Sequence, residues 1–201
     1  MKIDLPVLMY IHGFRSGANG SKREQLQEHF TGRYRVIAPE VDADPDKSLA
    51  KLNKIIAEEK PEIIVGTSLG GWMTLMCDSS VARLVVFNPS TYPGQTLSQW
   101  VGDELPYFCQ RLDGIQTYTL TRDVLDKYKS YDIENAITAK SNRIYALCST
   151  ADELIGDSHI KTLKPLLTPD RLMIVDDFGH RCSGMGMTHL FDILDNLTAP
   201  K

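Results

Sequence analysis

The chain has few cysteines, no concentration of basic residues and no long apolar run, and each absence excludes a class of protein. Its four cysteines, Cys77, Cys109, Cys148 and Cys182, include no C-x-x-C pair, which excludes zinc-ribbon and thioredoxin-like motifs. Lysine and arginine do not cluster and the net charge is −4, so the sequence predicts no nucleic-acid partner. We expect the scattered cysteines to be reduced thiols in a cytoplasmic protein.

No apolar stretch is long enough to cross a membrane, which takes about 20 residues in a helix. The apolar run closest to the N-terminus ends at Ile11, where His12 and Gly13 follow. That run is too short for the apolar part and cleavage site of a secretory signal. The sequence therefore predicts a cytoplasmic protein without a membrane span.

What the chain has instead is the composition of a globular domain, with 42% hydrophobic and 24% charged residues over 201 positions. Short apolar runs predict strands at Pro6–Ile11, Tyr34–Ala38, Glu62–Gly66, Arg83–Phe87, Arg143–Leu147 and Arg171–Val175. Amphipathic stretches predict helices at Ser21–Thr31, Lys47–Glu59, Leu69–Asp78 and Met185–Leu197. This alternation indicates a single α/β domain over residues 1–201, with a mostly parallel sheet of about six strands that helices bury on both faces.

One segment interrupts this alternation. Residues 89–137 hold several aromatic side chains but no clear strand, and a helix is expected within them at Thr121–Tyr131. The segment leaves the carboxyl end of a strand, where ligands bind in parallel sheets. We therefore expect a small helical cap over the site, in preference to an ordinary pair of surface helices.

The strongest local signal is Gly66-Thr67-Ser68-Leu69-Gly70, which lies between an apolar strand run and a helical pattern. This strand-turn-helix setting is the one in which a nucleophilic serine occupies a sharp, strained turn. Only small residues fit two positions before and two positions after that serine, as Gly66 and Gly70 do. Ser68 is therefore the predicted nucleophile.

A serine nucleophile needs a base, and the chain offers five histidines. His180 is the best candidate because it lies in a loop just after the last predicted strand, where Gly179 gives the loop freedom to aim the ring. The other histidines have structural interpretations: His12 orders its loop, His29 ends a helix, His159 lies near a helix start and His189 lies within the last helix. His180 is thus the predicted general base.

A carboxylate is expected to orient that histidine. Asp152 is the best candidate because it closely follows the predicted strand Arg143–Leu147, and polar residues at the carboxyl end of a strand reach into the site. The resulting chain order of serine, acid and histidine is the one found in enzymes with this serine turn. Glu153 is the neighbouring rival, and Asp176 and Asp177 are weaker ones. A helix cap is the structural alternative for Asp152.

We expect the backbone N–H groups of Phe14 and Leu69 to form an oxyanion hole for the reaction. An H-G pair, here His12-Gly13, closes the first predicted strand, and Gly13 lets the backbone approach a substrate closely. Arg15 is a candidate for binding a substrate carboxylate or phosphate, with a solvated loop arginine as the alternative.

Together, these motifs make the chain resemble the small bacterial YqiA/YcfP-like esterases, which are compact α/β-hydrolases. The resemblance rests on Tyr10-Ile11-His12-Gly13-Phe14, Gly66-Thr67-Ser68-Leu69-Gly70-Gly71, Asp152-Glu153 and Gly179-His180. It implies a triad of Ser68, Asp152 and His180, and ester or thioester hydrolysis without a metal or organic cofactor. Where many relatives carry an aromatic residue soon after the histidine, this chain has Arg181-Cys182.

The sequence therefore predicts a serine esterase that acts on a small-molecule ester through an acyl-enzyme. An acyl-thioesterase with the same triad is the close alternative, and a peptidase or carbon–carbon hydrolase would use the same residues. A non-catalytic binding module that kept the fold is the alternative from another class. The natural substrate, the acyl-chain length and the oligomeric state are left open, and a monomer is compatible with this size.

Overall fold

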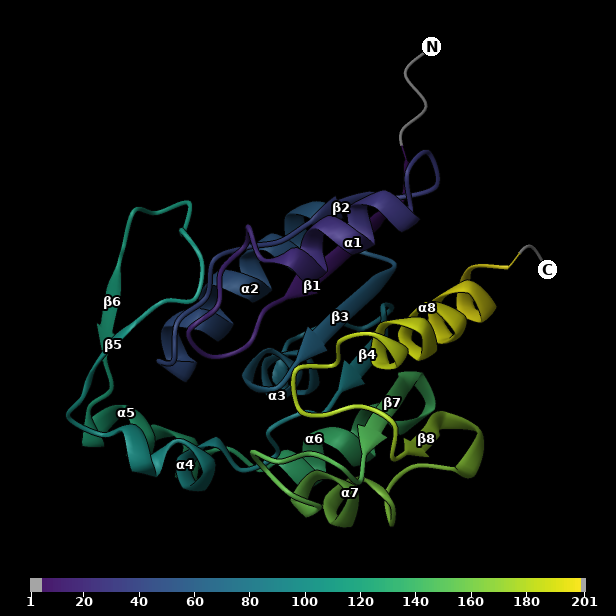
Figure 1. The fold of residues 1–201 in the computed structure, drawn as a ribbon. Helices are drawn as coiled ribbons and strands as arrows, with labels where there is room; N and C mark the ends of the chain where they lie inside the picture. Colours follow the sequence, from purple (N-terminus) through teal and green to yellow (C-terminus); the bar gives the residue numbers. More distant parts are fainter. Residues whose placement is uncertain (1–4, 200–201) are drawn as a thin grey trace.

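The computed structural model of the chain describes residues 5–199. The first four residues, which belong to the N-terminal stretch considered above as a possible secretory signal, lie outside this range. Six parallel strands form the central sheet in the order β2-β1-β3-β4-β7-β8 (Figure 1). They are β1 (Val7–Ile11), β2 (Arg35–Ile37), β3 (Ile63–Thr67), β4 (Arg83–Phe87), β7 (Ile144–Ser149) and β8 (Leu172–Val175). All six strands predicted from the apolar runs are confirmed, to within two residues at each end.

The predicted helices are confirmed as well. They are α1 (Ser21–His29), α2 (Pro45–Glu59), α3 (Leu69–Met76) and α8 (Met185–Thr198). Two further helices, α6 (Ile133–Lys140) and α7 (Ser158–Leu163), were not among the predicted ones. Within residues 5–199, no helix is long and apolar enough to cross a membrane.

The sheet separates two apolar layers, since successive side chains of a strand point to opposite faces. In β1, Leu8 and Tyr10 belong to the layer that contains side chains of α1 and α8. The intervening Met9 and Ile11 belong to the layer that contains side chains of α2 and α3. Every residue of β1 and β3 is buried, as expected for central strands covered on both faces.

The expectation of burial on both faces is wrong for β8. Met173 and Ile174 in this strand are 39% and 38% exposed. The reason is that β8 lies at the edge of the sheet, while α7 and α8 pack against its neighbour β7. The apolar run identified a strand correctly but carried no information on its place in the sheet.

The excursion at residues 89–137 contains α4 (Pro93–Thr96), α5 (Arg122–Lys127) and the start of α6. The helix predicted near residues 121–131 is thus confirmed. The expectation that the segment holds no strand is wrong, because β5 (Glu104–Pro106) and β6 (Thr117–Thr119) form an antiparallel hairpin. Strands of three residues are too short to show the alternation that would have revealed them. Figure 1 shows this hairpin, in teal, standing off from the sheet.

Aromatic contacts attach the excursion to the main body. The ring of Trp72, on α3, lies edge-on to those of Tyr128 and Tyr131, with centroids 4.8 and 5.2 Å away. Trp72 is almost fully buried and therefore serves packing. The Tyr128 hydroxyl also donates to the Ala43 carbonyl oxygen over 2.7 Å. The helical part of the excursion is therefore joined to the helix that follows the candidate nucleophile.

Candidate active site

Ser68 lies in the turn between β3 and α3 and has φ +52° and ψ −120°, a strained conformation for a residue with a side chain. A Cβ atom at Gly66 would lie 2.1 Å from Thr74 Oγ1. A Cβ atom at Gly70 would lie 2.2 Å from the Ile11 carbonyl oxygen. Both distances are far below van der Waals contact, so this tight turn requires glycine at both positions. The turn therefore has the geometry expected of a nucleophile elbow.

The structure brings Ser68, Asp152 and His180 together. His180 Nδ1 donates to Asp152 Oδ2 over 2.7 Å, and His180 Nε2 lies 2.9 Å from Ser68 Oγ. Because Nδ1 carries the proton in the first bond, Nε2 of the neutral ring is left to accept the serine hydroxyl proton. The Asp152 side chain is inaccessible to solvent and that of His180 nearly so. The three side chains thus form one chain of hydrogen bonds, which is buried at Asp152 and His180 and reaches a half-buried Ser68.

Asp152 is held from its own loop as well. Its Oδ1 accepts the N–H groups of Leu154 and Ile155, each over 2.9 Å. Burial is the largest single influence and raises the pKa of this carboxyl. The contact with His180 and the hydrogen bonds from the two amides together outweigh burial, so the pKa lies below its ordinary value. Asp152 is therefore a carboxylate wherever the protein is folded near neutral pH.

Glu153, the rival acid, contacts the backbone of the histidine loop and not its ring. Its Oε2 accepts the His180 N–H over 2.8 Å, and this hydrogen bond is the main cause of its lowered pKa. A Cβ atom at Gly179 would lie 2.7 Å from the same oxygen. A side chain at position 179 would therefore require the Glu153 carboxylate to shift away from the His180 amide.

Asn88, the first residue after β4, is a residue of the site that the sequence analysis missed. It is fully buried, its Oδ1 accepts the Ser149 N–H over 2.8 Å, and its Nδ2 donates to the Gly179 carbonyl oxygen over 3.3 Å. Ser149 Oγ in turn donates to the Phe178 carbonyl oxygen. These contacts tie the loop of the acid to the loop of the base. A polar residue directly after a central strand was the signal available in the sequence.

The loop after β1 passes close to the nucleophile. A Cβ atom at Gly13 would lie 3.3 Å from Ser68 Cβ. The Phe14 amide follows this contact, and the Leu69 amide opens α3 beside the serine. Neither amide donates any of the backbone hydrogen bonds of turns, loops and caps in the described range. Their use as an oxyanion hole stays a prediction.

His12 orders this loop by hydrogen bonds, which confirms its expected role. The buried ring accepts the Val41 N–H at Nε2 over 3.2 Å, and its Nδ1 lies 3.0 Å from the Gly13 carbonyl oxygen. Glu40 Oε2 lies 3.2 Å from the same Nε2. The ring is thus fully engaged away from the serine.

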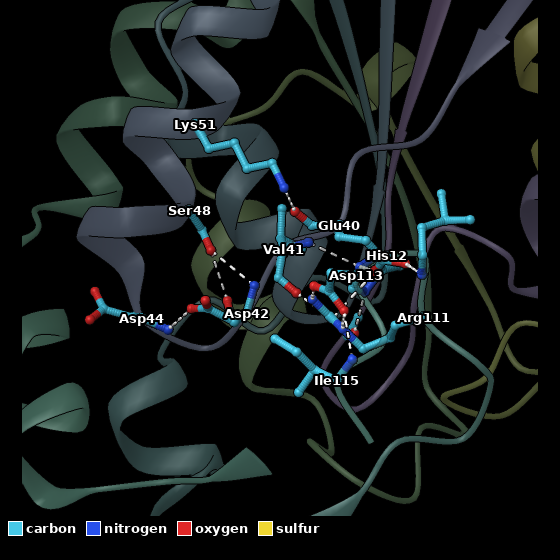
Figure 2. A network of polar contacts seen from close by, with 12 residues as sticks. His12, Glu40, Val41, Asp42, Asp44, Ser48, Lys51, Arg111, Asp113 and Ile115 are labelled. Carbon is cyan, nitrogen blue, oxygen red and sulfur yellow. Dashed lines mark hydrogen bonds and ion pairs between the residues drawn. The ribbon is translucent and has the colours of Figure 1, made fainter. Parts of the chain in front are cut away.

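Glu40 is the centre of a buried polar network that reaches the excursion (Figure 2). Its Oε1 accepts the Leu112 N–H over 2.8 Å, and its Oε2 lies 3.3 Å from Arg111 Nη1. Arg111 also donates to the Val41 carbonyl oxygen over 2.9 Å and pairs with Asp113. The sequence analysis missed this network because Glu40 and Leu112 are 72 positions apart. It joins three segments: the loop after β1, the loop after β2 and the hairpin.

The charge of Glu40 is fixed by these partners. Burial, the largest influence, raises its pKa, but the contact with His12, the hydrogen bond from the Leu112 amide and the nearby Arg111 guanidinium together lower it to about 2. The network therefore contains a permanent carboxylate beside a permanent guanidinium, both buried.

The remaining histidines lie outside this arrangement. His29 stacks on Phe191 and pairs with Asp195, and His189 pairs with Asp177 over 2.9 Å. His159, expected to be structural or solvated, is fully buried, and its ring nitrogens have no hydrogen-bond partner among the described residues. Burial is the main cause that lowers its pKa to about 4, so the ring is neutral.

Arg15, the candidate for substrate binding, is held against the excursion. Its Nε donates to the Pro106 carbonyl oxygen over 2.9 Å. Its guanidinium carbon lies 4.4 Å from the ring centre of Phe108 and 5.8 Å from that of Trp100. The alternative of a fully solvated loop arginine is therefore wrong, while a role in binding stays a prediction.

No group of three or more histidine, cysteine, aspartate or glutamate side chains within residues 5–199 is arranged to hold a metal ion. The four cysteines are unpaired thiols in the structure.

Comparison with known families gives one match that spans the chain. The model of an uncharacterised protein family (UPF0227) matches residues 7–197. This match confirms the resemblance to the YqiA/YcfP-like proteins that the motifs indicated. No curated protein matches the chain significantly.

Solved structures of similar fold are numerous, and three illustrate the range. Est1E from Butyrivibrio proteoclasticus has a TM-score of 0.72 at 13% identity, covering 96% of this chain and 87% of its own. Mouse alpha/beta hydrolase domain-containing protein 10 has a TM-score of 0.69 at 17% identity, with coverages of 98% and 92%. A monoacylglycerol lipase from Paleococcus ferrophilus has a TM-score of 0.64 at 16% identity, with coverages of 97% and 96%. At these identities the likeness establishes the α/β-hydrolase fold.

Proposed function

Because the chain belongs to the uncharacterised protein family UPF0227 and has the α/β-hydrolase fold, we propose that it is a serine hydrolase that cleaves carboxylic esters. The observation that carries the proposal is the unbroken set of hydrogen bonds from Ser68 through His180 to Asp152. A fold alone does not fix an activity, so the argument rests on this site. The names of Est1E and the monoacylglycerol lipase are compatible with the same class of reaction.

The first half of the reaction forms the acyl-enzyme. Ser68 Oγ attacks the ester carbonyl carbon while His180 Nε2 takes the hydroxyl proton. Asp152 keeps the other ring nitrogen protonated and stabilises the imidazolium that results. The backbone N–H groups of Phe14 and Leu69 stabilise the negative oxygen of the tetrahedral intermediate. His180 then gives its proton to the leaving alcohol.

The second half returns the enzyme to its starting state. A water molecule gives a proton to His180 Nε2 and attacks the acyl carbonyl carbon. The bond between the acyl group and Ser68 Oγ breaks, the serine recovers the proton from the imidazolium, and the carboxylic acid leaves. No step needs a group that the chain lacks.

The excursion at residues 89–137 has a part in this proposal as a cap over the site within a single domain. It leaves the carboxyl end of β4 and holds Arg15 through Phe108 and Pro106. In that position it would bound the space for the acyl group or the leaving group, with Arg15 available to a charged part of the substrate.

Two alternatives differ in kind. An acyl-thioesterase would use the same residues, and an oxyester and a thioester of equal acyl length distinguish it. A non-catalytic binding module would keep the fold without an activated serine. The strained backbone of Ser68 argues against the second alternative, since strain of this kind is usually retained where it serves a reaction.

The test is labelling of the pure protein with a fluorophosphonate, followed by mass spectrometry of the modified peptide. A single adduct on Ser68 would support an activated serine with a working base. Absence of an adduct on well-folded protein would contradict the proposal and favour a binding module.

A further inference from the structure

Two arginines on different loops flank the site. Arg15 follows Phe14, whose amide is proposed for the oxyanion hole, and Arg181 follows His180. Both guanidinium groups lie over the ring of Phe108, with distances of 4.4 and 5.2 Å from the guanidinium carbons to the ring centre. Three segments that are far apart in the sequence therefore meet at Phe108, and two of them carry residues next in sequence to Phe14 and His180.

Phe108 is the residue that both arginines share as a neighbour. Phe108 is 61% exposed, and its backbone N–H donates to the Arg15 carbonyl oxygen over 2.7 Å. A guanidinium group over an aromatic ring is attracted to the face of that ring. Arg15 Nε already donates to the Pro106 carbonyl oxygen, but the Nη groups of Arg15 and the whole guanidinium of Arg181 make no hydrogen bond within the described residues. Such N–H groups can bind an anion by parallel hydrogen bonds.

The charge of these arginines is not neutralised from within the described range. Neither Arg15 nor Arg181 has a carboxylate oxygen within 4.0 Å there. Four other arginines do have such a partner, and they are Arg33, Arg35, Arg111 and Arg171. The nearby Glu153 carboxylate is directed at the His180 amide.

A third cation lies close by. The Lys22 side chain is half-buried near Arg181 and Cys182, and its pKa is lowered first by burial and then by the Arg181 charge, although Cys182 opposes this. Lys22 thus adds a positive charge near Arg181, in a protein whose net charge is −4.

We propose that Arg15 and Arg181, held by Phe108, form an anion-binding subsite, so that the preferred substrates are esters that carry a carboxylate or phosphate group. The anion would accept hydrogen bonds from both guanidinium groups while the ester carbonyl lies at Ser68. This inference rests on the proposed esterase function and adds the chemical class of the substrate.

The test uses two pairs of esters that differ in one charge. The 4-nitrophenyl monoester of adipic acid is compared with 4-nitrophenyl hexanoate, which places the anion on the acyl side. The acetate ester of 4-hydroxybenzoate is compared with that of 4-hydroxybenzamide, which places it on the leaving group. We expect kcat/KM for the anionic member of at least one pair to be at least about tenfold higher, mainly through KM. The preference should fall as salt is added.

The arginine variants decide the assignment. In Arg15→Gln and Arg181→Gln the ratio of anionic to neutral kcat/KM should fall towards one, whereas Arg122→Gln, which removes an exposed charge from α5, should keep the ratio of the unmodified protein. A ratio near one in the unmodified protein for both pairs would overturn the subsite. A ratio that persists in both arginine variants would also overturn it.

A binding measurement separates this inference from the proposed function. Adipate and inorganic phosphate are each titrated into the protein, and binding is measured by calorimetry, which requires no turnover. The anion that binds more tightly identifies the class, carboxylate or phosphate. If no ester is cleaved but binding weakens about tenfold or more in both arginine variants, the subsite stands and the esterase proposal fails. If neither anion binds, or if both variants bind as the unmodified protein does, the subsite is rejected.

Discussion

At the scale of the residue, Ser68 is held in its strained conformation from several directions. Its N–H donates to the Phe87 carbonyl oxygen over 3.3 Å, and its own carbonyl oxygen accepts from Trp72 and Ser90 over 3.2 and 3.0 Å. A residue with a side chain at positive φ costs on the order of 1–3 kcal/mol and persists only where its surroundings fix it. Here strands β3 and β4 and helix α3 provide that fixation, so Oγ keeps one position relative to His180.

The Ser68→Ala variant should lose ester turnover completely and lose reaction with the fluorophosphonate. Alanine keeps the Cβ atom and therefore the backbone strain, so the far-UV circular dichroism and the melting temperature should change little. Ser98→Ala, at an exposed serine, is the matched control and should turn over normally. Retained turnover in Ser68→Ala would eliminate this serine as the nucleophile.

The roles of Asp152 and Glu153 can also be distinguished by measuring ester turnover. Asp152→Asn should lower kcat by about 10³- to 10⁴-fold, because an amide at this position favours the wrong histidine tautomer. Glu153→Gln should have a much smaller effect, since its oxygen still accepts the His180 N–H. The two variants are compared by steady-state kinetics on one oxyester. If Glu153→Gln shows the larger loss, the acid has been assigned one residue too early.

At the scale of the element, the site depends on loops that are tied to one another at the ends of the strands. Asn88 joins the loops after β7 and β8, and Glu40 joins the loops after β1 and β2 to the hairpin. Both residues are buried and hydrogen-bonded, which makes their removal costly. The positions of the reacting groups are thus determined by pairs of loops and not by any loop alone.

The Glu40→Gln variant should be less stable than the unmodified protein at pH 7, and the difference should shrink in acid. The pKa of Glu40 is about 2 in the folded protein against 4.5 ordinarily, so its ionisation stabilises the fold above pH 4.5 and this contribution is lost as the pH falls towards 2. The contribution of this ionisation to the free energy of unfolding is on the order of 3 kcal/mol at pH 7 and less than about half of that at pH 3. Urea unfolding at the two pH values measures the difference.

The matched control for this change is Glu58→Gln, at an exposed position on α2. It removes the same charge and should alter the free energy of unfolding by no more than a few tenths of a kcal/mol at either pH. A pH-independent difference between Glu40→Gln and the unmodified protein would mean that the shape of the side chain, and not its charge, maintains the network.

At the scale of the whole molecule, the two apolar layers and the hairpin have separate tasks. The layers on the two faces of the sheet are built almost entirely from strands and helices outside the hairpin. The hairpin instead supplies Arg111, Leu112 and Phe108, which contact the loops around the site. The fold is therefore expected to survive loss of the hairpin better than the activity does.

Replacing residues 103–119 by a short Gly-Ser turn tests this separation. The Gly102 N–H donates to the Leu120 carbonyl oxygen over 2.9 Å, so the two ends lie close enough to be joined. We expect the far-UV circular dichroism of the α/β fold to remain, while labelling of Ser68 by the fluorophosphonate slows at least about tenfold. The slowing follows because Glu40, which contacts His12, loses Leu112 and Arg111, and because Arg15 loses its contacts with the hairpin.

The control keeps the hairpin and changes only its surface. Leu112→Ser with Ile115→Ser alters side chains that are 68% and 49% exposed and should leave the labelling rate unchanged. Loss of the folded state in the excised protein, with a normal control, would show that the hairpin belongs to the core.

The sequence by itself determined the elements and the candidate residues. Apolar runs identified all six strands of the main sheet. For the central strands the reason is that strands covered on both faces need uninterrupted apolar side chains. The glycines around Ser68 identified the turn, since only that spacing fits so tight a bend. The catalytic roles of Ser68, Asp152 and His180 stay predictions, which the distances between them support.

Only the tertiary structure decided which distant residues meet. The order of the strands made β8 an edge, and the return of the hairpin placed Arg111 beside Glu40 and Phe108 beside Arg15. Such contacts leave no periodic signal, because each joins single residues from segments whose local patterns are independent. The physical reason is that the spacing of apolar residues determines which face of a helix or strand is apolar. Contacts between loops depend instead on where the ends of helices and strands lie after these elements have packed.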